Sequence, residues 1–333
     1  MGFKHVIGVL LGVLLAAATF VGKADAVCPE GGPAPCLGRY GEFPNVNLLI
    51  PWFRIGQSDV ADPTTLQDTL IVEIDLQNAT PVTSLDVTFW TVGSTKCFNK
   101  CVPSTASDVV PLSVLATFQG APAPAKAACG FVDETTETVG YVTIETFTGP
   151  NCSGDPVPEG ILGFVYYTDL QQGRAAGIMA PTFAGDPFGV GNPFDEFAVD
   201  PDQSMVFRIL NGLDLDFDGP DADDDDAAET LAVIWSDTNG GANFEDGTFL
   251  VCDEEEVCFS LTPPSIPDEV NFIPLDDFLV AGSGINGWLV LHNASGSPHN
   301  VLGYSDNRAT SPAAGLNWEV IFPAPLVNGN PLP

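Results

Sequence analysis

The stretch 205–237, MVFRILNGLDLDFDGPDADDDDAAETLAVIWSD, consists of an apolar run, an acidic segment and a second apolar run. Both apolar runs are short and rich in β-branched and aromatic residues, which is typical of strands. Eight aspartates lie between Asp214 and Asp226 and form the segment that joins the two runs. The stretch therefore predicts two strands connected by a highly charged loop.

The rest of the chain repeats this pattern of short strand-like runs separated by turn residues. The run at 84–92, SLDVTFWTV, alternates well enough for a half-buried strand. Sustained helical periodicity is hard to find, and GAPAPAKAA at 120–128 is expected to be an extended, proline-rich loop. The expected strands are 47–55, 69–76, 84–92, 112–118, 140–147, 161–167, 205–210, 230–235, 248–252, 257–261, 287–291, 301–304 and 318–322. This pattern predicts an all-β fold with β-sandwich domains of the immunoglobulin-like kind.

Changes in composition divide the chain into four parts. Residues 1–26 form a leader, and the Gly- and Pro-rich residues 27–46 are expected to form an irregular segment held by a disulfide. A second Gly- and Pro-rich region, 173–201, places a domain boundary at about residue 200. We therefore expect one β-sandwich domain over 47–200 and another over 201–333.

Three segments of the first half resemble three segments of the second half in the same order. The clearest pair is DTLIVEIDLQN at 68–78 and ETLAVIWSDTN at 229–239. The other two pairs are 140–149 with 287–296 and 161–177 with 301–315. Conserved order is what duplication of one unit predicts. The alternative is that β proteins reuse the same strand-forming residues.

The first 26 residues have the three parts of a secretory signal peptide. Lys4 gives a short positive region, residues 6–20 are apolar, and Ala24-Asp25-Ala26 is an A-x-A cleavage site. The mature chain should begin at Val27. The apolar part is shorter than the roughly 20 residues of a comfortable membrane span. We therefore expect a secreted protein with no membrane span once the leader is removed.

The charge of the chain limits its partners. The formal net charge is −34, and removal of the leader makes it one unit more negative because two lysines and one aspartate are lost. Such a chain repels nucleic acid and anionic membranes, which both require a basic footprint. It attracts cations instead.

All eight cysteines follow the leader, as expected for disulfides in an oxidising compartment. Their clustering along the sequence favours local pairs. The expected pairs are Cys28–Cys36, Cys97–Cys101, Cys129–Cys152 and Cys252–Cys258. Zinc is the competing interpretation, but the spacings are not those of CxxC pairs, and two histidines remain after the leader.

The acidic segment has the spacing of a calcium-binding loop. Carboxylates stand at alternate positions 1, 3 and 5, a glycine stands at position 6, and a carbonyl and a carboxylate are available at positions 7 and 12. The candidate ligands are Asp214, Asp216, Asp218, Pro220 and Asp225. The loop resembles the EF-hand and other DxDxDG loops, but it has strand-like flanks and an aspartate at position 12. Calcium is thus the predicted ion, and a solvated acidic run is the alternative.

Other chemical signatures are weak. CDEEEVC at 252–258 is expected to be an acidic hairpin tip rather than a metal site. We find no HExxH, GxSxG or P-loop motif, so the sequence favours a role other than catalysis. Five tryptophans could stack on sugars, although core packing is their more common use.

Four strand-like motifs are NLLIPWF (47–53), LDVTFW (85–90), TLAVIW (230–235) and INGWLVL (285–291). In this order they resemble those of a group of uncharacterised secreted bacterial surface proteins. The resemblance implies an exported β protein and carries no activity. We therefore expect a calcium-stabilised structural or adhesive protein of the cell surface, extracellular space or periplasm, with surface polymers, matrix polymers or other copies as partners. The alternative is a secreted carbohydrate-binding module or glycosidase.

Overall fold

The computed structural model describes most of the predicted strands. The residues described are 47–57, 66–75, 82–93, 95–105, 109–156, 161–169, 174–183, 198–199, 203–211, 228–236, 247–253, 257–261, 268, 270–275, 285–293, 299–309, 318–321 and 326–328. They belong to one compact unit that extends from Tyr40 to Pro333. The predicted signal peptide and its cleavage site, together with Cys28 and Cys36, lie outside the described residues.

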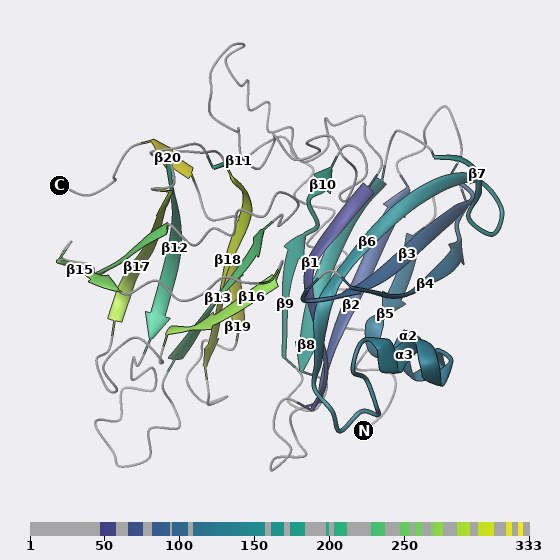
Figure 1. Cartoon of the computed structure of the whole chain (residues 1–333), viewed down its shortest axis with the longest axis horizontal. Helices are drawn as coiled ribbons and strands as arrows, with labels where there is room; N and C mark the ends of the chain where they lie inside the picture. The colour runs from purple at the N-terminus through teal and green to yellow at the C-terminus, as the bar shows by residue number, and fades with distance from the viewer. Residues whose placement is uncertain are drawn as a thin grey trace. The chain divides into compact units, whose positions relative to one another are not determined.

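Among the described residues, the first half has ten strands and two helices, which Figure 1 labels. We call the strand order β4-β3-β6-β1-β10 sheet A and the order β5-β2-β8-β9 sheet B; the end of β1 also pairs with β2, and β7 pairs with β6. The elements are β1 Asn47–Gln57, β2 Leu66–Asp75, β3 Ser84–Thr91, β4 Lys96–Pro103, β5 Val109–Ser113, α2 Val114–Gly120, α3 Ala123–Ala128, β6 Thr138–Gly149, β7 Ser153–Pro156, β8 Ile161–Asp169, β9 Arg174–Met179 and β10 Thr182–Phe183.

The second half forms two further antiparallel sheets. Sheet C has the order β16-β13-β18-β19, with β11 also paired to β18, and sheet D has the order β15-β14-β17-β12-β20. The strands are β11 Ala198–Val199, β12 Gln203–Asn211, β13 Ala228–Ser236, β14 Gly247–Asp253, β15 Cys258–Leu261, β16 Val270–Pro274, β17 Ile285–Asn293, β18 His299–Ala309, β19 Trp318–Ile321 and β20 Leu326–Asn328. The predicted all-β class is confirmed.

Apart from the short strands β7 and β11, the described strands of the two halves have the same topology. Taken in chain order, β1 to β6 correspond to β12 to β17, and β8 to β10 correspond to β18 to β20. Under this correspondence sheet A has the order of sheet D, and sheet B has the order of sheet C. The segments that resemble one another in sequence lie in corresponding strands, namely β2 and β13, β6 and β17, and β8 and β18. The strand pairing thus supports the duplication predicted from the sequence.

A glycine contact in the two cores also matches. Gly163 in β8 leaves room for Leu48 of β1, and Gly303 in β18 leaves room for Phe207 and Met205 of β12. A Cβ atom added to either glycine would lie within 2.6 Å of the side chain that it faces. Leu48 pairs with Ile144 of β6, and Met205 pairs with Leu291 of β17. Because Ile144 and Leu291 hold the same position in these corresponding strands, Leu48 and Met205 also correspond. The halves therefore share a packing detail as well as a strand order.

The strands β1 and β12 differ by one residue. In β1 the register shifts between Ile50 and Phe53, so that Pro51 and Trp52 occupy a β-bulge. In β12 the corresponding residues are Phe207 and Ile209. Only Arg208 lies between them, and the register with β17 is continuous. The bulge allows Trp52 to reach a second layer of side chains.

The hydrophobic residues form two clusters, and sheet C contributes to both. Along β13, Val233 and Trp235 belong to the larger cluster with the first half, whereas Ala232 and Ile234 belong to the cluster between sheets C and D. This alternation follows from the two-residue period of a strand. The predicted boundary near residue 200 thus separates the described sheets, while the larger cluster crosses it. The immunoglobulin-like topology stays a prediction.

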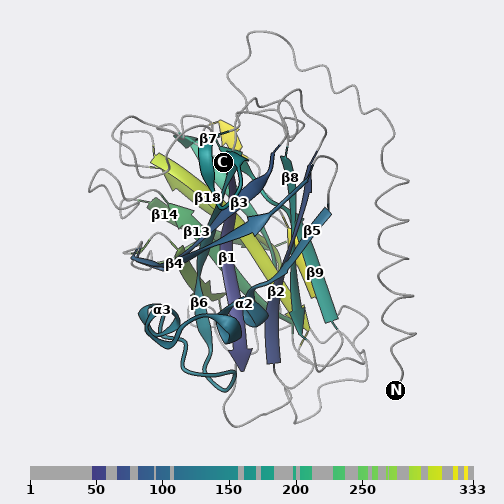
Figure 2. The ribbon, with the colours of Figure 1, turned by 90° about the vertical axis from the view of Figure 1, so that its right-hand side faces the viewer.

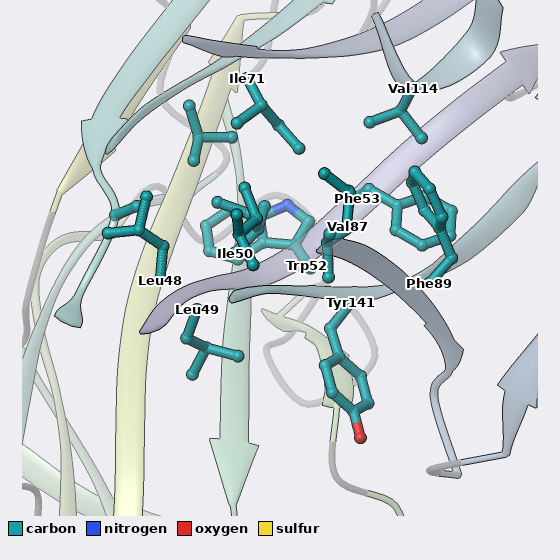
Figure 3. Packing of buried hydrophobic residues seen from close by; sticks show 14 of the residues in the cluster. Leu48, Leu49, Ile50, Trp52, Phe53, Ile71, Val87, Phe89, Val114 and Tyr141 are labelled. Carbon is teal, nitrogen blue, oxygen red and sulfur yellow. The ribbon is translucent and has the colours of Figure 1, made fainter. Parts of the chain in front are cut away.

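Strand β1 lies at the centre of the larger cluster (Figure 3). Its residues Leu48, Leu49, Ile50, Trp52 and Phe53 are all fully buried. Consecutive residues of a strand point to opposite faces, so burial of all five shows that both faces of β1 are covered. This explains why LLIPWF at 48–53 is apolar throughout rather than alternating.

The region 112–128 corrects two expectations from the sequence. A strand was expected at 112–118, but β5 ends at Ser113 and α2 follows from Val114; a loop was expected at 120–128, but α3 forms over Ala123–Ala128 (Figure 2). Ser113 Oγ accepts the N–H of Ala116 at 3.0 Å, and Asp68 Oδ1 accepts the N–H of Leu115 at 2.8 Å. These capping bonds start a helix that local propensity alone does not specify. Burial raises the pKa of Asp68, and the bonds from Ser113 and Leu115 partly oppose that shift.

Candidate functional site

The predicted calcium ligands lie outside the described residues, and the structure describes the two strands that flank them. Strand β12 ends at Asn211 in sheet D, and β13 begins at Ala228 in sheet C. The strand-like flanks predicted from the sequence are confirmed. The acidic segment thus connects the two sheets that enclose the second core. Calcium binding by Asp214, Asp216, Asp218, Pro220 and Asp225 stays a prediction.

The second acidic segment connects β14 to β15. Cys252 and Cys258 face each other across these strands and form a disulfide, as predicted. Asp253 Oδ1 accepts the N–H of Val257 at 2.9 Å, which narrows the end of the hairpin. Within the described part of the chain, no group of three or more His, Cys, Asp or Glu side chains is placed to hold a metal ion.

Two of the predicted disulfides are wrong. The structure pairs Cys97 with Cys129 and Cys101 with Cys152, instead of Cys97 with Cys101 and Cys129 with Cys152. Cys97 and Cys101 lie four residues apart in one extended strand, β4, so their Cα atoms are about 13 Å apart. A disulfide requires Cα atoms closer than about 7 Å. Each cysteine of β4 therefore bonds to a different neighbouring segment.

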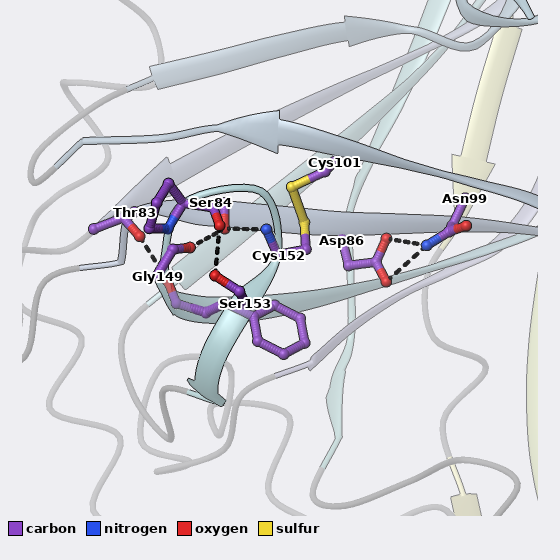
Figure 4. Close-up of a disulfide and its surroundings, with 10 residues drawn as sticks. Thr83, Ser84, Asp86, Asn99, Cys101, Gly149, Cys152 and Ser153 are labelled. Atoms are coloured by element: carbon purple, nitrogen blue, oxygen red, sulfur yellow. Dashed lines mark hydrogen bonds between the residues drawn. A yellow bond between two sulfur atoms is a disulfide. The ribbon is translucent and has the colours of Figure 1, made fainter.

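The Cys101–Cys152 disulfide belongs to a small network at the end of sheet A (Figure 4). Ser84 Oγ donates to the carbonyl oxygen of Gly149 at 2.7 Å and accepts the N–H of Cys152 at 3.0 Å. Asn151 and Cys152 both have left-handed backbones, with φ of 58° and 54°. Such angles are uncommon for residues other than glycine, and here the hydrogen bond and the disulfide hold the turn.

A layer of aromatic side chains joins the two halves. Tyr141 of sheet A contacts Trp235 of sheet C, with ring centroids 6.5 Å apart and ring planes at 77°. Trp52 contacts Tyr304 of sheet C in the same edge-to-face manner, with centroids 4.8 Å apart. Edge-to-face packing is a favoured arrangement of aromatic pairs, so these contacts add geometric specificity to the burial.

Two polar contacts accompany this aromatic layer. The N–H of Val270 donates to the carbonyl oxygen of Val92 at 3.2 Å, so the backbones of the two halves are directly hydrogen-bonded. The guanidinium of Arg54 lies 5.9 Å from the ring centroid of Phe272, within the range of a cation–π contact. The halves therefore meet through one continuous interface, which the sequence prediction of two separate domains did not include.

The tryptophan side chains that the structure describes differ in exposure to solvent. Trp52 and Trp235 are buried and Trp90 is partly buried, as expected for core packing, whereas Trp288 on sheet D is 44% exposed. The guanidinium of Arg208 lies 5.2 Å from the ring centroid of Trp288. The sequence did not distinguish Trp288, because it stands in an apolar run like the others.

One serine–histidine pair also became visible only in the structure. Ser204 Oγ and His292 Nδ1 are 2.9 Å apart on the paired strands β12 and β17. Ser204 is fully buried, so its hydroxyl is not presented to a substrate. We interpret the pair as a cross-strand contact within sheet D.

Comparison with known proteins adds no assignment. No family model, curated protein or solved structure matches this chain. No helix among the described residues is long and apolar enough to cross a membrane. The three described disulfides indicate an oxidising compartment, either extracellular or periplasmic.

Proposed function

We propose that this chain is a secreted structural or adhesive protein that works at the cell surface or in the extracellular space. The placement of the disulfides carries the proposal. Strand β4, at the edge of sheet A, is held by Cys97–Cys129 and Cys101–Cys152, and β15, at the edge of sheet D, is held by Cys252–Cys258. Edge strands are where sheets mispair with other chains. Covalently secured edges suit a protein that must persist outside the cell.

We also propose that calcium stabilises the second half. The acidic segment connects sheets C and D, so an ion held by its aspartates would link the two sheets across their shared core. Carboxylates concentrated in one segment repel each other, and a divalent cation would replace this repulsion with coordination. The proposal rests on the sequence spacing and on the confirmed strands at both ends of the segment.

Fractionation of the producing cells tests the proposed location. The protein should be recovered with intact disulfides from the culture medium, the outer surface or the periplasm, and its N-terminus should be Val27. Recovery from the cytoplasm with reduced cysteines and an intact leader would contradict the proposal.

Carbohydrate binding is the second candidate, and exposed Trp288 is the observation that favours it. Exposed aromatic rings provide flat apolar surfaces, and Arg208 beside the indole supplies hydrogen-bond donors. A glycan array compares the unmodified protein with a Trp288→Ala variant. Specific binding that disappears in the variant would support this candidate.

A further inference from the structure

The shared topology identifies which residues of one half correspond to which residues of the other. Gly140 in β6 and Gly287 in β17 hold the same position, because a Cβ atom added to either would overlap a carbonyl oxygen of the neighbouring strand, β3 or β14. The next residues, Tyr141 and Trp288, therefore also correspond. Both point to the outer face of their sheet, away from the core that sheets A and B, or C and D, enclose.

These two corresponding residues differ sharply in exposure. Tyr141 is 0% exposed, because sheet C covers the outer face of sheet A and places Trp235 against the ring. Trp288 is 44% exposed on the outer face of sheet D. Around Trp288 this face presents Val206, Arg208 and Leu250, each only partly buried, while Val290 between Val206 and Leu250 is 2% exposed. The outer face of sheet D therefore corresponds to the outer face of sheet A, which sheet C covers. Its aromatic residue, Trp288, is nevertheless exposed.

A second pair of corresponding residues, one in sheet C and one in sheet B, also differs in exposure. Val270 of sheet C is 2% exposed and donates its N–H to Val92 across the junction. Its counterpart in sheet B is Val109. Val270 pairs with Trp235 of β13, Val109 pairs with Ile74 of β2, and Trp235 and Ile74 hold corresponding positions. Val109 is 49% exposed. The outer face of sheet B therefore corresponds to the face of sheet C that covers sheet A.

The outer face of sheet B is apolar over four strands. Along β2 and β8, the residues of this face alternate with residues that point into the core. The pairing of β5, β2, β8 and β9 places the outward-facing residues side by side. The apolar and aromatic members of this face that are exposed or partly buried are Leu70, Val72, Val109, Pro111, Leu162, Phe164, Tyr166 and Met179, and the uncharged polar residues Ser113 and Thr168 lie at its end. None of these side chains carries a charge at neutral pH.

We propose that the outer face of sheet B in one copy of the chain packs against the outer face of sheet D in another copy. The contact would repeat between molecules the junction that sheets A and C form within one molecule. In the junction within one molecule, Trp52 contacts Tyr304. At the corresponding positions of the proposed contact, Arg208 of one copy would face Phe164 of the other, so a cation–π pair would replace the aromatic pair. This inference goes beyond the proposed function and does not require calcium.

The contact joins two different surfaces, so each added copy leaves one face of each kind free. Such heterologous contacts build open assemblies unless their geometry closes a ring. The net charge of −34 per chain opposes association at low ionic strength. Salt screens this repulsion and leaves the apolar contact intact, so the assembly should grow with salt concentration.

Sedimentation velocity on the purified, oxidised protein tests the proposal over a range of protein and salt concentrations. We expect species larger than the monomer that increase with both. Trp288→Glu and Val109→Glu should each abolish them, because each variant loses one of the two faces. Val132→Glu is the matched control, since Val132 is 69% exposed and lies on neither face. Circular dichroism and thermal melting establish that each variant is folded.

A mixture of the two variants gives the sharper result. The Val109→Glu chain keeps an intact sheet D face and the Trp288→Glu chain keeps an intact sheet B face, so the mixture should form dimers and nothing larger. An isologous contact would not produce this complementation. A wild-type protein that stays monomeric at high salt, with or without glycan binding at Trp288, would overturn the proposal, as would a mixture that fails to dimerise. Neither result would affect the proposed location or calcium binding.

Discussion

The indole of Trp52 lies flat on the phenol ring of Tyr167, with ring centroids 4.4 Å apart and ring planes 5° apart. The Tyr167 hydroxyl donates to the carbonyl oxygen of Trp52 at 3.3 Å. The edge of Tyr304 from the second half completes the group. This stack therefore connects sheet B, strand β1 and sheet C, and its disruption should be felt in both halves.

Replacement of Trp52 by alanine should destabilise the whole compact unit. Loss of a fully buried aromatic side chain costs about 3–5 kcal/mol. We expect calorimetry to show one cooperative transition for the wild type and a lower melting temperature for Trp52→Ala. Trp288→Ala is the matched control and should change the melting temperature little. Equal effects of the two substitutions would contradict the assigned role of the stack.

The stability of the protein should fall at alkaline pH because of Tyr167. Burial raises the pKa of Tyr167 well above the ordinary value of 10.0, and the charge of Asp306 adds to the shift. The unfolded chain therefore loses this proton first as the pH rises past about 10, which favours unfolding. The contribution is complete below that pH and is lost as the pH approaches the folded-state pKa.

Urea unfolding of a Tyr167→Phe variant checks this pH dependence. The variant should lose about 1 kcal/mol near neutral pH, because one hydrogen bond is missing. Its free energy of unfolding should then decline less steeply than that of the wild type above about pH 10. Tyr166→Phe provides a comparison at a partly buried phenol and should change the slope less. Parallel slopes for all three proteins would exclude Tyr167 as the cause.

The disulfides should differ in their effect on stability. Cys101–Cys152 links residues 51 positions apart, and Cys252–Cys258 links residues 6 positions apart. In the chain-entropy model these loops contribute about 4 and about 2 kcal/mol respectively. Double replacement by serine should therefore cost more at Cys101 and Cys152. The measurement is denaturant unfolding of the two variants, and the reverse order would show that native-state effects dominate.

Calcium should raise the melting temperature of the protein. Extracellular calcium sites have dissociation constants of about 0.1–1 mM. At ten times that concentration, binding adds about 1.4 kcal/mol, which corresponds to a shift of a few degrees. EDTA should remove the shift, and magnesium should restore it less well than calcium. A variant with Asp214→Ala and Asp216→Ala should not respond, and sodium chloride at matched ionic strength should not reproduce the effect.

The sequence predicted the β class, most of the long strands and the echoes between the halves, because these features depend on local apolar patterns. It missed β4, since KCFNKCVP carries two lysines and shows little apolar alternation. It also missed α2, where Val114, Leu115 and Phe118 fit a strand as well as a helix. The helix depends on the capping bond from Asp68, a residue far away in the sequence.

The candidate surface was beyond the reach of sequence reasoning for a different reason. The tryptophans at 90, 235 and 288 stand in similar apolar runs, so the sequence alone does not tell which of them is covered. Their exposure depends on which sheet lies against each outer face, and that is decided by packing between the halves. The disulfides of β4 depend likewise on neighbours that only the strand order brings close.

The extra residue at the bulge of β1 bears on the fidelity of folding. Two halves with the same strand order expose the chain to mispairing, in which β1 inserts beside β17 and β12 beside β6. A shift by one residue turns every later side chain of a strand to the wrong face. The bulge makes β1 one residue too long for the straight register of β17, so an exchanged strand would point Phe53 away from the core. The same residue that lets Trp52 join the halves thus helps each half to recognise its own strands.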